Sequence, residues 1–359
     1  MDFYKSGYAP IIFQIFSKMP CALVQILYPL GLITGHMRLP NLGIAVESLG
    51  DPKTFVNPVR TAEEAGFHSV WLVEVNDVDT LAFASALCQV TDKIMICTGV
   101  VNSSLRLPTL LAMGAATVSS LSHGRFVLGI GAGSSPMKNR DTINIRVTRL
   151  RETLQLIRAI LSGDKTSFQG SLFEVQGFQL GFKPKYSIPL YGAAMGLRMV
   201  KIVAELADGL VLMLPTLEHT KLAVRTVRSI IKKRGVNQFR IACHFVTVIS
   251  ENESMVEARR MVARFCVIPP YHNSFARMGF AQELAKIDKA LSTKQREAWR
   301  SVPPEMADQL IIHGTVEKCV KRISDYVKVG VTDPIIYPSL MTAGPKSLEK
   351  VIKDFSRYN

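Results

Sequence analysis

The stretch from Lys93 to Gly133 constrains the fold more than any other part of this chain of 359 residues. Ile94–Val101 is an apolar, β-branched run of strand length, and Pro108 stands where a helix can begin. The helical pattern ends at His123-Gly124, and Phe126–Ile130 is a short apolar run typical of a parallel strand that is buried on both faces. The stretch therefore predicts one β-α-β unit.

Three glycines, Gly129, Gly131 and Gly133, remove side chains where the second strand of this unit emerges. The backbone there can turn sharply or approach a ligand closely. A dinucleotide fingerprint would need Gly-x-Gly-x-x-Gly at the opening of a helix. Here Ser134 stands at the third position, and Gly133 falls one residue early. The spacing disfavours a nicotinamide-type Rossmann site.

Strand and helix patterns alternate along the rest of the chain. Including the two strands above, the predicted strands are Leu42–Val46, Ser69–Val75, Ile94–Val101, Phe126–Ile130, Ile188–Ala193, Leu210–Leu214, Phe239–Ile249 and Thr332–Tyr337. Parallel strands joined by right-handed crossovers favour a closed (β/α)8 barrel, the TIM barrel, over an open sheet. We expect a single barrel domain over 37–359, with an irregular excursion at Lys165–Lys185 and an insertion at 266–312.

Composition restricts the class of protein. The six cysteines form no Cys-x-x-Cys pair, so we expect buried free thiols in a reducing compartment, the cytoplasm. The seven histidines show no metal-ligand spacing, and we predict no metal. The net charge of +14 fits solvated basic helix faces or attraction of a polyanionic ligand. No motif supports binding to nucleic acid.

Residues 1–36 differ from the rest of the chain. Met19–Gly35 is charge-free and mostly apolar, but it is short for a bilayer span and contains Pro20 and Pro29. Met37 stands just before the first predicted strand. We expect either that translation starts at Met37 or that the chain carries an extra N-terminal segment, without stable membrane anchoring.

The motif GRFVLGIGAG, which follows a strand containing TGV and a helix reading LLAMGAATVSSLS, resembles the luciferase-like (bacterial luciferase) superfamily. The resemblance continues through residues 149–184, 188–213 and 313–336, in the same order. Within the superfamily the chain is most similar to the coenzyme F420-dependent reductases of the methylene-tetrahydromethanopterin reductase type.

This resemblance implies an oxidoreductase that transfers a hydride between the deazaflavin coenzyme F420 and a small organic substrate, with a methylene-tetrahydromethanopterin-type pterin as one candidate. It also implies a homodimer. Two alternatives remain open. One is an FMN-dependent luciferase-like monooxygenase, and the other is a non-catalytic barrel that binds a flavin or a partner protein.

Functional residues of such a barrel lie at the C-terminal ends of the strands. After the fifth predicted strand, the small residues Ala193, Ala194 and Gly196 open a helix, so backbone N–H groups at its positive end could bind phosphate. Arg198 and Thr216 would add a charge and a hydroxyl donor. The alternative is an ordinary tight turn between strand and helix.

A second group of expected cofactor residues follows the third and fourth predicted strands and comprises Gly99, Val100, Asn102 and Gly131. Similar enzymes place a bulge after the third strand, sometimes with a non-proline cis peptide, against one face of the deazaflavin ring. The resemblance therefore implies that the Gly99–Val100 bond occupies this position.

The acid–base group is harder to assign, because related reductases often carry an acid within strand one and an Asp-His pair at the end of strand two. This chain has Ala45 in strand one and Glu74-Val75 after strand two. The candidates for catalysis are Glu47, Glu74 and Asp77, since a desolvated carboxyl at a barrel mouth can titrate near neutrality. The alternative role for each is capping or salt bridging at a strand end.

Overall fold

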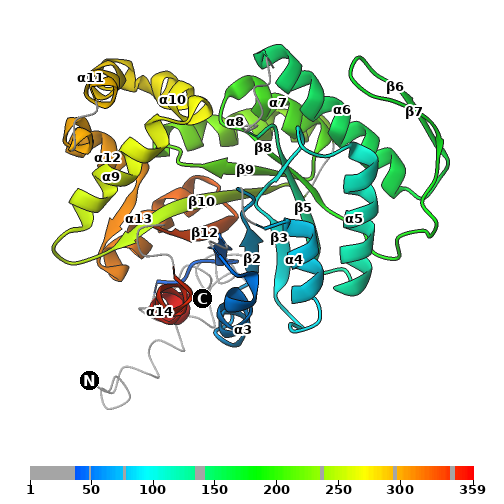
Figure 1. Ribbon diagram of the computed structural model, residues 1–359, viewed down its shortest axis with the longest axis horizontal. Helices are drawn as coiled ribbons and strands as arrows, with labels where there is room; N and C mark the ends of the chain where they lie inside the picture. Colours follow the sequence, from blue (N-terminus) through cyan, green and yellow to red (C-terminus); the bar gives the residue numbers. More distant parts are fainter. Residues whose placement is uncertain are drawn as a thin grey trace, which may run out of the picture.

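The computed structural model describes residues 37–47, 50–75, 78–133, 142–234, 238–293, 297–339 and 344–359. Parallel strands in this part of the chain close into a barrel, because β12 pairs with both β10 and β1 (Figure 1). The barrel strands are β1 (Gly43–Val46), β2 (Ser69–Leu72), β3 (Met95–Thr98), β5 (Phe126–Gly131), β8 (Leu190–Ala193), β9 (Gly209–Met213), β10 (Arg240–Ile249) and β12 (Asp333–Pro338). The predicted (β/α)8 barrel is confirmed.

Helices surround the barrel and connect its strands (Figure 1). They are α3 (Val56–Glu64), preceded by the turn η2 (Pro52–Phe55), α4 (Thr80–Leu87), α5 (Pro108–Leu121), α6 (Ile143–Leu161), α7 (Leu197–Leu206), α8 (Leu217–Arg234), α9 (Ser254–Cys266), α13 (Val316–Val329) and α14 (Pro345–Phe355), followed by the turn η6 (Ser356–Tyr358). Local sequence sets their starts: Asp79 caps α4 by accepting from two backbone N–H groups, and Pro108 occupies the first turn of α5.

The core has two layers because alternate strand residues face opposite sides of the sheet. One set, including Ile44 and Val70, packs against the helices. The other set, including Trp71, Tyr191 and Val211, fills the barrel interior. All residues of β1, β2, β5 and β12 are buried, which explains why these strands read as continuous apolar runs.

The structure differs from the sequence prediction at three places. The expected irregular excursion contains an antiparallel hairpin, β6 (Thr166–Gln169) and β7 (Glu174–Phe178). The predicted strand Ile94–Val101 is divided into β3 and the short β4 (Val101–Asn102), which pairs with β5. A further strand, β11 (Ile312–Gly314), extends the sheet beside β10.

The insertion at 266–312 is helical in its described part. It forms α10 (Pro269–Phe275), the π-helical turn η3 (Ala276–Phe280), α11 (Ala281–Ser292), η4 (Ala298–Ser301) and α12 (Pro304–Leu310). These elements gather beside α9, in yellow and orange in Figure 1. Their apolar side chains, such as Phe275 and Leu284, join the same cluster as the barrel interior. The insertion is thus packed onto the barrel.

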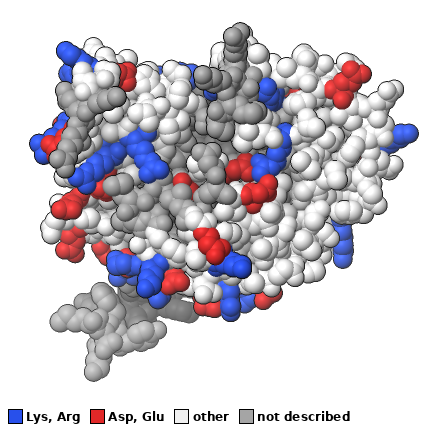
Figure 2. Space-filling view, in the orientation of Figure 1, with Lys and Arg blue, Asp and Glu red and all other residues white. Residues whose placement is uncertain are grey.

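Charged side chains are unevenly spread over the surface. Figure 2 shows Lys and Arg mixed with Asp and Glu around one part of this face, while the part that carries α4 and α5 in Figure 1 is largely uncharged. Leu107, Leu110 and Met113 are exposed at the start of α5. Among the described residues, no helix has both the length and the apolar character that crossing a membrane requires.

Candidate active site

The strand order places most of the predicted site residues at one end of the barrel. β3, β5 and β8 are consecutive neighbours in the sheet, so the loops that follow them adjoin. The predicted residues in these loops are Gly99, Val100, Asn102, Gly131, Ala193, Ala194 and Gly196. Glu47 follows β1 on the far side of β2, whereas Asp77 lies outside the described residues.

The segment between β3 and β4 forms the expected bulge, and the Gly99–Val100 peptide bond is cis. Two glycines of β5 accommodate it. A Cβ at Gly129 would lie 2.1 Å from the carbonyl oxygen of Thr98, and one at Gly131 would lie 2.6 Å from Cγ2 of Val100. The Thr98 hydroxyl also bonds both the N–H and the C=O of Gly129, each at 2.8 Å. The bulge therefore packs directly against Gly129 and Gly131, where a larger residue would clash with it.

Asn102, at the end of the bulge, is held by local bonds. Its Oδ1 accepts hydrogen bonds from the N–H and the hydroxyl of Ser104, at 2.9 and 2.8 Å. A Cβ at Gly133, which has φ of +63°, would overlap the Asn102 side chain at 2.1 Å. The third glycine of the motif thus makes room for Asn102 rather than for a helix turn.

Glu74 is tied to the same bulge. Its carboxylate accepts from the Asn102 N–H at 3.0 Å and pairs with Arg106 at 2.6 Å. Arg106 also pairs with Asp79, the cap of α4. Burial alone would lower the pKa of Arg106, but its bonds to Glu74 and Asp79 outweigh burial and raise it. These contacts favour salt bridging at a strand end as the role of Glu74.

We expect Arg106→Met to lower the free energy of unfolding by about 3 kcal/mol, because it leaves the buried Glu74 carboxylate without its cation. Chemical denaturation measures the change. Arg300→Met is the matched control, since the pair of Arg300 with Glu297 is exposed and its loss should change stability by less than about 0.5 kcal/mol. Equal losses in the two variants would contradict an anchoring role for Arg106.

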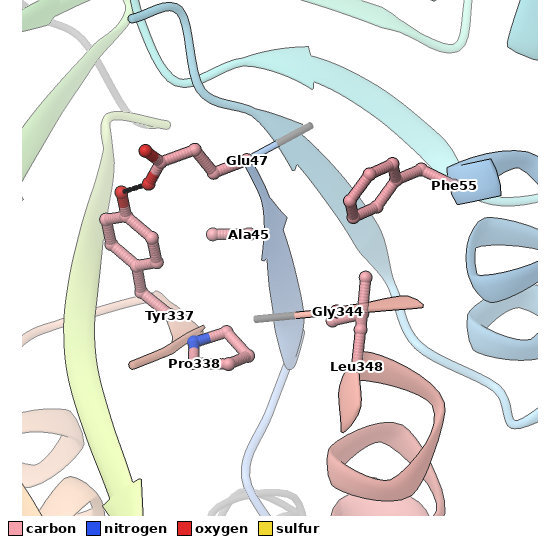
Figure 3. Close-up of a pocket in the computed structure, with 7 residues that line it drawn as sticks. All are labelled: Ala45, Glu47, Phe55, Tyr337, Pro338, Gly344 and Leu348. Carbon is pink, nitrogen blue, oxygen red and sulfur yellow. Dashed lines mark hydrogen bonds between the residues drawn. The ribbon is translucent and has the colours of Figure 1, made fainter. Parts of the chain in front are cut away.

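Glu47 lies at the mouth of the barrel, where the phenol of Tyr337 donates a hydrogen bond to its carboxylate. Both side chains are buried, at 7 % and 5 % exposure, and they line a small cavity with Phe55 and Leu348. In Figure 3 the two polar groups point toward each other, away from Phe55. Glu47 thus accepts a hydrogen bond from a neutral phenol, whereas Glu74 pairs with an arginine.

The insertion reaches this mouth through Tyr271 of α10. Its hydroxyl donates to Sδ of Met213, the last residue of β9, at 3.1 Å. Burial and the nearby charge of Glu47 raise the pKa of Tyr271 to about 12. A side chain of the insertion thus contributes to the same end of the barrel as Glu47.

His244 of β10 is a buried residue that the sequence analysis did not single out. Its ring lies edge-on to Trp71 and Tyr337, with centroids 5.5 and 6.0 Å apart. It contacts the bulge as well, because a Cβ at Gly99 would lie 2.8 Å from its Cε1. Neither ring nitrogen has a hydrogen-bond partner among the described residues, and burial lowers the pKa of His244 to about 3. His244 is therefore neutral beneath the bulge.

The loop after β8 leads into α7, whose first turn leaves N–H groups without intrahelical partners. Ala194 does not supply one of them, since its N–H donates to the carbonyl of Val211 at 3.1 Å. Ala193 lies against Gly131, because a Cβ added to Gly131 would lie 3.5 Å from the Cβ of Ala193. The bulge and the start of α7 are thus contiguous.

An arginine and a buried histidine lie at the start of α7. An added Cβ at Gly196 would meet only the guanidinium of Arg277 from η3, at 3.8 Å. His219 of α8 hydrogen-bonds the backbone of Met195, and burial together with the charge of Arg277 lowers its pKa. Its Nε2 is buried without a partner among the described residues. Neither Arg277 nor His219 was expected, because their positions in the sequence give no signal.

The two other predicted residues of this loop region have structural contacts. Arg198 is exposed and donates to Asn144 at the start of α6, at 2.8 Å. Thr216 is buried and caps α8 by accepting from the His219 N–H at 3.1 Å. Arg198 lies in the first turn of α7, and Thr216 directly precedes α8. Nowhere among the described residues do three or more His, Cys, Asp or Glu side chains lie together as metal ligands would.

Comparisons with known proteins identify the family of this chain. A model of the luciferase-like monooxygenase family matches residues 34–333. The chain is 28 % identical to the 5,10-methylenetetrahydromethanopterin reductase of Archaeoglobus fulgidus, over 82 % of this chain and 92 % of that one. It is 30 % identical to an F420-dependent glucose-6-phosphate dehydrogenase of Amycolatopsis mediterranei, over 45 % and 53 %.

A solved structure shares the fold. It is the coenzyme F420 dependent tetrahydromethanopterin reductase of Methanopyrus kandleri, with a TM-score of 0.74 at 22 % identity, over 88 % of this chain and 98 % of that one.

Proposed function

Because this chain belongs to the luciferase-like monooxygenase family, we propose that it is an oxidoreductase that uses the deazaflavin coenzyme F420. Two of the proteins named above, the glucose-6-phosphate dehydrogenase and the tetrahydromethanopterin reductase of known structure, are named as F420-dependent, and their names give different substrates. The substrate proposed first is a methylene-tetrahydromethanopterin-type pterin, since the Archaeoglobus fulgidus enzyme aligns over most of its length.

The observation that carries the proposal is the bulge at Gly99–Val100 beside the start of α7. The two features suit the two ends of one ligand. A flat ring can lie on the bulge, whereas a phosphate fits the N–H groups of α7, which Gly196 leaves uncovered. The guanidinium of Arg277 increases the preference for an anion there.

The bound coenzyme supplies the hydride chemistry, and the protein supplies binding, orientation and a dry pocket. Gly99 and Val100 would support the ring, and Gly196, Arg198 and Arg277 would hold the phosphate. Glu47 exchanges the proton that accompanies the hydride, because it is buried at the mouth and bonded to a neutral donor. Glu74 and Asn102 keep the bulge in place.

Equilibrium binding followed by fluorescence quenching tests the cofactor. We expect the full coenzyme to bind with a Kd of about 1 μM or lower, and the deazaflavin chromophore without its phosphate and glutamate tail to bind at least about tenfold more weakly. FMN should bind more weakly than the coenzyme. A preference for FMN would instead favour a monooxygenase, and binding of neither ligand would leave a non-catalytic barrel.

We also propose a homodimer in the cytoplasm. The uncharged helix α5 exposes Leu107, Leu110 and Met113, an apolar surface that a second copy would cover. Light scattering after gel filtration measures the assembly. The described cysteines are free and buried, as is usual for proteins of a reducing compartment.

A further inference from the structure

The pair formed by Glu47 and Tyr337 joins the first and last strands of the barrel. β1 pairs with β12 in parallel, so their C-terminal ends lie together although the two residues are 290 positions apart. Both side chains line the small cavity at the mouth (Figure 3). Elsewhere in that cavity the lining is apolar, with Phe55 and Leu348. A carboxyl and a phenol are thus the polar side-chain groups among the described residues that line this cavity.

Among the described residues, titratable and charged groups near this pair come from α9, α10 and β10. Tyr271 of α10 already donates to Met213, and His244 of β10 is a neutral ring at its edge. Arg264 of α9 is a positive charge that acts on Tyr337, and its effect is smaller than those of burial and Glu47. Burial, followed by the charge of Glu47, raises the pKa of Tyr337 well above its usual value. Tyr337 therefore stays protonated and remains a donor.

We propose that Tyr337 is a positioning residue that holds the Glu47 carboxyl toward the barrel mouth and favours its ionised form. The inference rests on the proposed function of Glu47 in proton exchange. A hydrogen bond from a neutral donor stabilises a carboxylate more than a carboxylic acid. It also fixes the side-chain torsions, so the carboxyl does not have to be ordered when substrate binds.

In the proposed step, one proton passes between Glu47 and the substrate. A bound reduced coenzyme would supply the hydride to a substrate carbon and would release a matching proton on oxidation. The Glu47 carboxylic acid would give its proton to the substrate heteroatom and become a carboxylate, and the released proton would restore the acid for the next turnover. In the reverse direction the carboxylate takes that proton back. The Tyr337 O–H bond is retained in both directions and only its hydrogen bond strengthens or weakens. The hydrogen bond from Tyr337 thus lowers the pH at which Glu47 changes state.

Titration of Glu47 in the coenzyme-free protein tests the pair directly. The carbon-13 signal of selectively labelled glutamate is followed against pH, and its assignment comes from Glu47→Gln. We expect Tyr337→Phe to move the midpoint of the Glu47 signal to higher pH, because the carboxylate loses its donor. Tyr326→Phe is the matched control, since this buried phenol donates to the Pro215 carbonyl instead, at 3.1 Å. It should leave the midpoint unchanged.

A second variant keeps the ring and the bond. Site-specific 3,5-difluorotyrosine at position 337 is a stronger donor, so the midpoint should move to lower pH. With methylene-tetrahydromethanopterin and reduced coenzyme F420, the limb of the pH–rate profile that belongs to Glu47 should move in the same direction for each variant. The proposal is overturned if neither variant at position 337 shifts the midpoint of the Glu47 signal. It is also overturned if the midpoint shifts while the pH–rate profile stays the same. Failure of the wild-type protein to bind the coenzyme would instead contradict the proposed function.

Discussion

Replacing Glu47 by glutamine is expected to lower turnover by about 10²- to 10⁴-fold, the range that general acid–base catalysis contributes. The amide keeps the shape of the carboxyl and can still accept the hydrogen bond of Tyr337. It cannot gain or lose a proton in the working pH range. Coenzyme binding should stay within about twofold, because the bulge and the start of α7 are untouched. Steady-state rates and fluorescence titration measure the two quantities.

Glu74→Gln distinguishes the two described carboxyl candidates. Glu74 pairs with Arg106 and accepts a hydrogen bond from the Asn102 N–H, so its charge stabilises the bulge. We expect this variant to lose stability and coenzyme affinity together, with turnover at saturating coenzyme reduced much less than in Glu47→Gln. The reverse order of the two turnover losses would assign proton exchange to Glu74.

The sequence predicts the barrel well because each strand carries its own signal. β1, β5 and β12 are buried on both faces, so each reads as a short apolar run, and the structure places each within about two residues of the predicted bounds. The break at Gly99–Val100 has no such signal. The apolar residues on both sides of Gly99 suit a strand, and only the family resemblance pointed to that bond.

The site was harder to predict because its contacts join distant parts of the chain. Tyr337 meets Glu47 only because the barrel closes between β12 and β1. Arg277 and Tyr271 reach the mouth from an insertion whose packing has no counterpart in the periodicity of the sequence. His244 stands in an apolar run, where its neighbours give no indication that its ring lies beneath the bulge.

Gly129→Ala is expected to have the largest effect on the fold of the site. The new Cβ would lie 2.1 Å from the carbonyl oxygen of Thr98, and a backbone atom cannot rotate away as the end of a side chain can. We expect the free energy of unfolding to fall by roughly 3 kcal/mol or more. Gly181→Ala is the matched control, because nothing lies within 4 Å of the added Cβ. Its effect should stay within about 0.5 kcal/mol.

Gly131→Ala separates stability from binding on the same strand. Its closest neighbour is Cγ2 of Val100, at 2.6 Å, so the added methyl pushes a side chain of the bulge and not the strand beside it. We therefore expect a smaller loss of stability than in Gly129→Ala, measured by denaturation, together with a clear loss of coenzyme affinity, measured by fluorescence. Wild-type affinity in both folded variants would mean that the ring does not rest on the bulge. The ring would then have to bind elsewhere at the barrel mouth. The proposal that Gly99 and Val100 support the ring would be wrong.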